Sequence, residues 1–283
     1  MTEHSTDYKQ AAIDQWTADP IASDVAIGEP GTRSYFETVL AGRAEYAPWM
    51  AVELGYAPGA VDVAELDVLD IGCGSGIDLA GYARAGANVT GVDLTPRHVE
   101  LARKHLAELG LGAPVLEGDA EQLPFEDASF DRASSNGVLH HTPDFHAALR
   151  EIHRVLRPGG EARIIVYNKH SLHYWFNQVL FHGIIKRELL EERSMANVLS
   201  RNVEFSTSGG RPLVRVYTPH AVRRALRATE FKDVRTVVRG FHHDSAFPVH
   251  ILSQRFPKLK DPEVEDRIGR VAGWYVVARA TRP

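Results

Sequence analysis

The sequence predicts an α/β protein with a doubly wound, largely parallel sheet. Between residues 66 and 167, short apolar runs rich in Val, Ile and Leu alternate with stretches of helical periodicity. Such runs are typical of strands buried on both faces, and repeated strand–helix units form parallel sheets with right-handed crossovers. A second observation is the glycine-rich turn 72–76 directly after the first run, because ligands bind at the carboxyl ends of parallel strands.

Two helical patterns precede the first strand. Residues 8–19 have helical spacing, and so do residues 35–54 after a loop rich in Pro and Gly. We therefore expect residues 1–60 to form an N-terminal helical cover or lid on the core. Such a cover either only packs on the sheet or also carries side chains into the site; the candidates are Tyr8, Trp16, Arg33 and Tyr35.

The ligand-binding core is predicted over residues 61–167. Its expected strands are Leu66–Ile71, Asn88–Asp93, Pro114–Gly118, Phe130–Ser135 and Ala162–Tyr167. The helices between them are expected at Ile77–Ala85, from Pro96 to Gly110 with proline in the first turn, and at Phe145–Leu156, where Pro158-Gly159-Gly160 ends the helix.

The alternation breaks after the fifth strand. Residues 168–217 are therefore predicted to be an insertion that caps the site. Apolar residues recur at helical spacing from Leu172 to Ile184. Such a stripe can pack in the core of the protein or form a dimer interface, so a homodimer is possible on the sequence alone. Residues 218–283 return to the sheet, with a helix at Pro219–Thr229 and strands at Phe231–Val238 and Val271–Ala280.

Composition narrows the class of protein. A net charge of −5 without a clustered basic excess argues against a nucleic-acid partner. The single cysteine, Cys73, excludes an internal disulfide and fits a reducing compartment. The N-terminal residues are polar, and no run approaches the ~20 apolar residues of a membrane span. We expect a cytoplasmic protein without a secretory signal.

The spacing of the glycines bears on which nucleotide binds. They fall as G-x-G-x-G, and Ile77 stands where a dinucleotide fingerprint has its third glycine. Asp93, at the end of the second strand, can accept from both hydroxyls of a ribose, which suits NAD and S-adenosylmethionine alike. At this point an NAD-dependent oxidoreductase stays open as an alternative, although the glycine spacing argues against it.

Five stretches in register decide between these cofactors. They read VLDIGCGSG, GVDLT, EGDAEQLPFEDASFD, GVLHHTPD and LREIHRVLRPGGEARI, and they lie between residues 68 and 164. In them the chain resembles the class I S-adenosylmethionine-dependent methyltransferases, and most nearly the small-molecule group that includes the ubiquinone/menaquinone-biosynthesis methyltransferases. The resemblance implies a Rossmann-like sheet of seven strands, six parallel and the last antiparallel, with S-adenosyl-L-methionine as cofactor and S-adenosyl-L-homocysteine as product.

The resemblance also implies cofactor contacts at the ends of the first four strands. Asp70, Gly72 and Gly74 would hold the methionine part, and Asp93 the ribose hydroxyls. The remaining contacts would be Leu94 packed on the adenine, Asp119 accepting from its amino group, the backbone N–H of Ala120 donating to its ring, and Asn136 and Val138 beside the reactive sulfonium.

Side chains after strands 4 and 5 are the candidates for catalysis. Histidine as a residue type titrates near neutral pH, so His140 or His141 is a candidate base. Paired histidines are common at this place in the resembled family, where they can also serve only shape and backbone hydrogen bonding. Tyr167 is expected to face the acceptor, followed by Asn168, Lys169 and His170. A catalytic role for Cys73 is not expected, because the sequence shows no base near it.

The acceptor is expected to be a small, partly apolar molecule methylated on O, N or C, in bacterial biosynthetic or secondary metabolism. The Asn/Asp-Pro-Pro-aromatic stretch of enzymes that methylate nucleobase or glutamine amines is missing, because residues 134–137 read SSNG. We expect no metal, since His242, His243 and His250 lack an evident acidic partner in the sequence. A non-catalytic S-adenosylmethionine-binding or regulatory protein is the other alternative.

Overall fold

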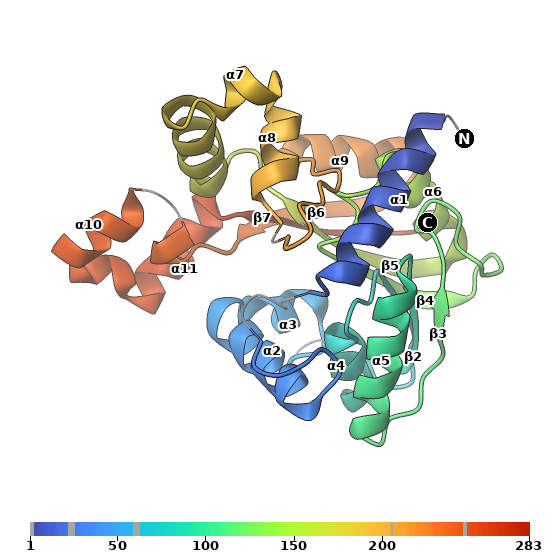
Figure 1. Cartoon of the computed structure of the whole chain (residues 1–283). Helices are drawn as coiled ribbons and strands as arrows, with labels where there is room; N and C mark the ends of the chain where they lie inside the picture. Colours follow the sequence, from blue (N-terminus) through green and yellow to red (C-terminus); the bar gives the residue numbers. More distant parts are fainter. Residues whose placement is uncertain (1–2, 22–25, 59–62, 205, 246–247) are drawn as a thin grey trace.

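The computed structural model describes residues 3–21, 26–58, 63–204, 206–245 and 248–283, and it contains one sheet of seven strands (Figure 1). The strand order is β3-β2-β1-β4-β5-β7-β6. Strands β1 to β6 share one direction, and β7 runs against both of its neighbours. This confirms the predicted fold. The strands are β1 (Asp67–Ile71), β2 (Asn88–Asp93), β3 (Val115–Glu117), β4 (Phe130–Asn136), β5 (Leu156–Tyr167), β6 (Lys232–Arg239) and β7 (Tyr275–Thr281).

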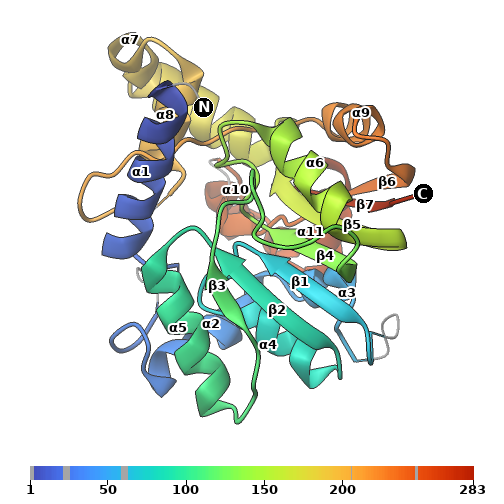
Figure 2. The same ribbon diagram turned by 90° about the vertical axis from the view of Figure 1, so that its right-hand side faces the viewer.

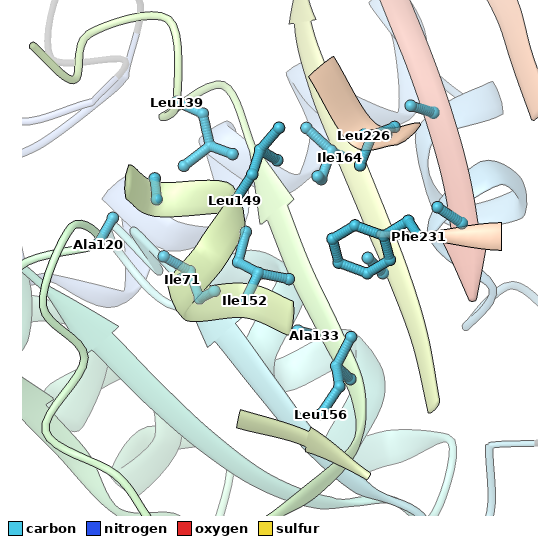
Figure 3. Packing of buried hydrophobic residues seen from close by; sticks show 14 of the residues in the cluster. Ile71, Ala120, Ala133, Leu139, Leu149, Ile152, Leu156, Ile164, Leu226 and Phe231 are labelled. Carbon is cyan, nitrogen blue, oxygen red and sulfur yellow. The ribbon is translucent and has the colours of Figure 1, made fainter. Parts of the chain in front are cut away.

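Each face of the sheet has its own apolar core. Neighbouring residues of a central strand point to opposite faces, so Ile164 packs in one core and Ile165 in the other. The first core lies under α6 (Phe145–Val155) and α9 (Pro219–Ala228) and includes Leu149 and Phe231 (Figure 3). The second lies under α3 (Trp49–Leu54), α4 (Ile77–Arg84) and α5 (Pro96–Glu108).

The N-terminal segment forms three helices. Helix α1 (Glu3–Ala18) crosses the molecule between the core and the insertion (Figures 1 and 2), and α2 (Arg33–Tyr46) packs on α5, where Phe36 stacks on His105 at 4.3 Å between ring centroids. The sequence predicted one helix over residues 35–54, but the structure has two helices there, so this prediction was wrong. Pro48 has no N–H to donate, so α2 ends at Tyr46 and α3 starts anew. The predicted boundary between residues 60 and 61 lies outside the described residues.

The insertion is helical but does not bury the predicted stripe. It contains the π-helix η1 (His173–Ile185), α7 (Glu188–Glu192) and α8 (Met195–Asn202). The wider turn of a π-helix shifts the buried face to Tyr174 and Gln178. Trp175 and Ile184, which α-helical spacing places inside, are therefore half-exposed.

Two further boundaries differ from the prediction. The Pro158-Gly159-Gly160 stretch lies within β5, where the pairing with β4 shifts register instead of ending in a loop. Residues 262–272 form α11 (Pro262–Ala272), preceded by η2 (His243–Ser245), α10 (Val249–Arg255) and η3 (Pro257–Lys260). The last strand thus begins at Tyr275 and not at Val271, which lies exposed in the last turn of α11.

Candidate active site

A cavity of about 780 Å³ lies at the carboxyl ends of the strands, the position expected for this topology. Its volume is within the range of small-molecule sites. Of the predicted site residues, Asp70 and His140 do not line it, and neither do Asn168, Lys169 and His170 after Tyr167. Those that do are Gly72, Gly74, Asp93, Leu94, Asp119, Ala120, Asn136, Val138, His141 and Tyr167.

The glycine turn presents bare backbone to this cavity. Gly72 and Gly74 have φ angles of +70° and +53°, which side chains rarely adopt. A Cβ at Gly72 would lie 2.2 Å from Cγ2 of Val138, whereas one at Gly74 would have only a methyl of Ile21 within 4 Å. The cavity therefore reaches the backbone of Gly74, which fits a cofactor lying against the turn.

Asp93 ties the turn to the second strand. Its Oδ2 accepts from the backbone N–H of Gly74 at 2.9 Å, and its Oδ1 accepts from that of Thr95 at 2.9 Å. Burial alone would raise the pKa of Asp93, but the nearby His98 and the two N–H donors hold it below its ordinary value. The ionised carboxylate keeps lone pairs for ribose hydroxyls.

Asp70 is buried away from the cavity. Its Oδ2 has no hydrogen-bond partner among the described residues, and burial, followed by the nearby charge of Asp78, raises its pKa well above the ordinary value. An unpartnered buried carboxyl group is costly unless another group satisfies it. Asp70 therefore stays a predicted ligand of the methionine part.

Arg43 and Asp78 were not predicted from the sequence, yet they form a hydrogen-bond network with the predicted Asn136. The carboxylate of Asp78 accepts from Nη1 of Arg43, from Oη of Tyr56 at 2.6 Å and from Nδ2 of Asn136 at 2.9 Å. Arg43 and Asn136 both line the cavity. Asp78 thus fixes the direction of the predicted Asn136, and Arg43 brings a cation to the cavity from the N-terminal segment.

Helix α1 covers the side of the cavity at Asp119. Nζ of Lys9 lies 2.6 Å from both Oδ2 of Asp119 and Oε2 of Glu121. Trp16 lies between His98 and His141, with ring centroids 6.1 and 5.8 Å away. Of the four side chains predicted for a lid, only Trp16 lines the cavity.

The opposite corner of the cavity gathers His141, Tyr167 and Glu204. Nδ1 of His141 lies 2.7 Å from the carbonyl oxygen of Leu213, and its Nε2 lies 3.5 Å from Oε1 of Glu204. Oη of Tyr167 donates to the same carboxylate oxygen at 2.9 Å. Burial, and then the charge of Glu204, raise the pKa of Tyr167 well above its usual range, so it stays a donor.

His140 lies beside this corner but does not line the cavity. It is fully buried, and neither of its ring nitrogens has a hydrogen-bond partner among the described residues. Burial, and then the neighbouring His141, lower its pKa well below the ordinary value. Its ring packs on Tyr167 at 3.8 Å between centroids. The geometry favours His141 over His140 as a base.

Two clusters have ligand atoms close enough for a metal ion: His140, His141 and Glu204, and His242, His243 and Glu265. In the second, Oε1 of Glu265 on α11 lies 2.7 Å from Nδ1 of His243. The acid that the histidine spacing lacks in the sequence thus comes from α11. His250 lies on α10 and is not part of this cluster.

Comparison with known proteins agrees with the geometry. The model of a methyltransferase domain family matches residues 69–164. The chain is 37% identical over 119 residues to the ubiquinone biosynthesis O-methyltransferase of Xanthomonas oryzae pv. oryzae strain PXO99A (42% of this chain, 50% of the relative). It is also 37% identical over 102 residues to the sterol 4-C-methyltransferase strm-1 of Caenorhabditis elegans (35% and 30%). The chain spans half or less of the length of these relatives.

Solved structures share the fold over most of the chain. A methyltransferase in complex with the Haloferax volcanii Trm112 activator covers 87% of this chain and 94% of its own, with a TM-score of 0.57 and 22% identity. An S-adenosylmethionine-dependent methyltransferase from Mesorhizobium loti covers 86% and 100%, with a TM-score of 0.52 and 21% identity.

The match over residues 69–164 and the shared fold support a methyltransferase domain in this part of the chain, and they imply S-adenosylmethionine as its cofactor. None of the helices in the described part of the chain is long and apolar enough to cross a membrane.

Proposed function

We propose that the protein transfers a methyl group from S-adenosylmethionine to a small, partly apolar acceptor. The observation that carries this proposal is one cavity that runs from the glycine turn and Asp93 to the corner of His141 and Glu204. The O- and C-methyltransferase relatives agree with a small acceptor. The biosynthetic role and the homodimer remain parts of the proposal.

The cofactor is proposed to lie along the strand ends. Gly72 and Gly74 would hold its methionine part with Asp70 and Arg43, because a carboxylate suits an ammonium group and a guanidinium suits a carboxylate. The bound cofactor would supply an electrophilic methyl group on a sulfonium. The remaining proposed contacts are Asp93 to the ribose, Leu94, Asp119 and Ala120 to the adenine, and Asn136 and Val138 beside the methyl group.

The cover and the cap are proposed to complete the acceptor side. We assign residues 1–60 to the cover, 61–167 to the binding core, 168–217 to the cap and 218–283 to the rest of the sheet. Trp16 from the cover and Val203 from the cap both line the cavity. Apolar walls of this kind orient an acceptor and exclude water, which favours transfer to the acceptor over loss of the methyl group to water.

Calorimetry and a methyl-transfer assay test the proposal together. We expect S-adenosylmethionine and S-adenosylhomocysteine to bind and NAD not to bind. A labelled methyl donor should then label a member of a panel of phenols, amines and ketones. Tight binding of NAD alone would point to an oxidoreductase. Binding of S-adenosylmethionine with no labelled product from any acceptor would favour the regulatory alternative.

A further inference from the structure

The cluster of His242, His243 and Glu265 lies where α11 packs against β6 and the chain that follows it (Figure 1), and the proposed function does not use it. Gly269 allows this close packing, because a Cβ there would lie 3.4 Å from the backbone nitrogen of Phe241. Residues four apart lie on one face of a helix, so the same face of α11 directs Glu265 towards the two histidines. The side chains of His242, His243 and Glu265 are only 24%, 14% and 15% exposed, so water has limited access to them.

Both imidazole rings turn a nitrogen towards the same carboxylate oxygen. Nδ1 of His243 lies 2.7 Å from Oε1 of Glu265, and Nε2 of His242 lies 4.0 Å from that oxygen. A tetrahedral Zn²⁺ ion with bonds of about 2.0–2.1 Å holds its ligand atoms about 3.3 Å apart, which is between these two distances. The ligand atoms of the three side chains lie within 4.8 Å of one another, so small side-chain rotations would bring them to one ion.

Asp244 faces the other nitrogen of each ring. Its Oδ1 lies 3.2 Å from Nε2 of His243, and its Oδ2 lies 3.9 Å from Nδ1 of His242. A metal-bound histidine commonly donates its second ring N–H to a carboxylate, which fixes the orientation of the ring. In the metal-bound form Nδ1 of His242 would carry a proton and face this carboxylate, in place of its 3.3 Å contact with the backbone N–H of Asp244.

An ion pair alone accounts for only part of this arrangement. His243 lies between the carboxylates of Glu265 and Asp244, and this contact needs no second imidazole. The ring of His242 nevertheless lies beside that of His243, at 4.3 Å between centroids, although its Nε2 is too far from Glu265 for a hydrogen bond. A shared cation explains why both rings converge on one oxygen, because two imidazoles and a carboxylate are a ligand set that Zn²⁺ accepts.

We propose that His242, His243 and Glu265 bind a divalent transition-metal ion, with Zn²⁺ as the best match, and that Asp244 orients both rings. Three protein ligands leave one position of a tetrahedral ion for water. The ion would tie α11 to the chain after β6. The ring of His242 also contacts that of Tyr46 edge-on at 4.9 Å, and Tyr46 lines the cavity, so the ion would support one wall of the cavity.

Co²⁺ and Zn²⁺ alone test this site in the full-length protein after metal is removed with EDTA. Tetrahedral Co²⁺ absorbs visible light, so the wild type should develop a Co²⁺ band that added Zn²⁺ abolishes. Mg²⁺ should not displace Co²⁺, because it prefers oxygen ligands. Glu265→Gln should lose the band. In calorimetry, Asp244→Asn should weaken Zn²⁺ binding by about 10–100-fold, because it keeps all three ligands and removes only the carboxylate behind them.

Two matched controls should keep the band: His250→Gln, which changes a histidine of α10 outside the cluster, and Glu204→Gln, which removes the acid of the other cluster. If circular dichroism shows that Glu265→Gln does not fold, His242→Gln replaces it and should also lose the band. Equal Zn²⁺ affinity in the wild type and in these ligand variants overturns the proposal. So does loss of the band in Glu204→Gln, since the other cluster would then hold the ion. A wild type that binds neither Co²⁺ nor Zn²⁺ has only an ion pair here, which also overturns the proposal.

Discussion

At the scale of single residues, Asp93 has two tasks that one carboxylate can perform together. It holds the glycine turn through the N–H of Gly74, and it presents its remaining lone pairs to the cavity. The pKa of its carboxyl group lies below the ordinary value, so it is ionised at neutral pH. Hydrogen bonds to an ionised acceptor are stronger than bonds between neutral groups.

We therefore expect Asp93→Ala to weaken binding of S-adenosylhomocysteine by about 1.5–3 kcal/mol for each hydrogen bond lost. Isothermal titration calorimetry measures this change, and urea unfolding shows whether the fold is retained. Glu108→Ala, at an exposed position on α5, is the control and should bind normally. Unchanged affinity in Asp93→Ala would mean that the ribose is held elsewhere.

Residues differ in how far the sequence alone predicts them. Asp93 and Gly74 follow apolar strands directly, so the strand pattern places them at the ligand edge. Glu204 and Arg43 lie outside the strand–turn–helix units, in the cap and the cover. Their side chains reach the cavity only because segments that are distant in the sequence pack together. The spacing of residues within either segment does not indicate that packing. Charged residues are too common on helices to be a signal without it.

At the scale of elements, α1 joins the two sides of the cavity. Lys9 contacts Asp119 and Glu121 on the core, and Asp19, just beyond the helix, accepts two hydrogen bonds from Thr207 of the cap at 2.8 and 2.6 Å. Trp16 lies between these attachments along the chain. The two ion pairs of Lys9 are partly buried. Loss of the cation would leave the carboxylates of Asp119 and Glu121 close together without a positive charge between them.

We expect Lys9→Met to loosen α1 and to raise the dissociation rate of S-adenosylhomocysteine several-fold. Stopped-flow fluorescence follows this rate, with Trp16 as a reporter inside the cavity. Lys104→Met removes a more exposed lysine of α5 and should leave the rate unchanged. If both variants release the ligand at the wild-type rate, α1 does not restrict exit from the site.

The elements also show where periodicity fails as a guide. The core strands repeat a burial pattern that apolar runs predict well. The stripe from Leu172 to Ile184 obeys α-helical spacing, but i→i+5 hydrogen bonding rotates its buried face, and the sequence carries no mark of that choice. Helix α11 was missed although Val264, Ile268 and Val271 recur at helical spacing, and Gly269 is its only buried residue.

At the scale of the whole molecule, buried histidines couple stability to pH. Burial lowers the pKa values of His105, His140 and His153 in the folded state. The unfolded chain then binds more protons than the folded one below the ordinary histidine pKa of about 6.5. Stability is therefore full above that value and decreases as the pH falls from 7 towards 5, by up to about 1.4 kcal/mol per pH unit for each histidine.

His140→Phe should reduce this pH dependence, because an aromatic ring that cannot take up a proton would replace the histidine against Tyr167. Urea unfolding at pH 7 and pH 5 gives the slope of the unfolding free energy. His146→Gln changes an exposed histidine and serves as the control. An unaltered slope in His140→Phe would show that this side chain is protonated alike in both states. Asp93 does not affect this slope between pH 7 and pH 5. Its pKa is lowered in the folded state, so its contribution to the free energy of unfolding is lost only at lower pH, when the carboxyl group protonates.

The attachment of α1 to both core and cap has a kinetic consequence. One continuous segment holds both Asp119 and the cap loop at Thr207. Under the proposed function, which places the adenine at Asp119, an opening of this segment would free cofactor and acceptor together. A turnover would then begin and end with the same event, and the two products would leave within one opening. Exchange of cofactor without exchange of acceptor requires α1 to detach at Lys9 while its end at Asp19 stays in place.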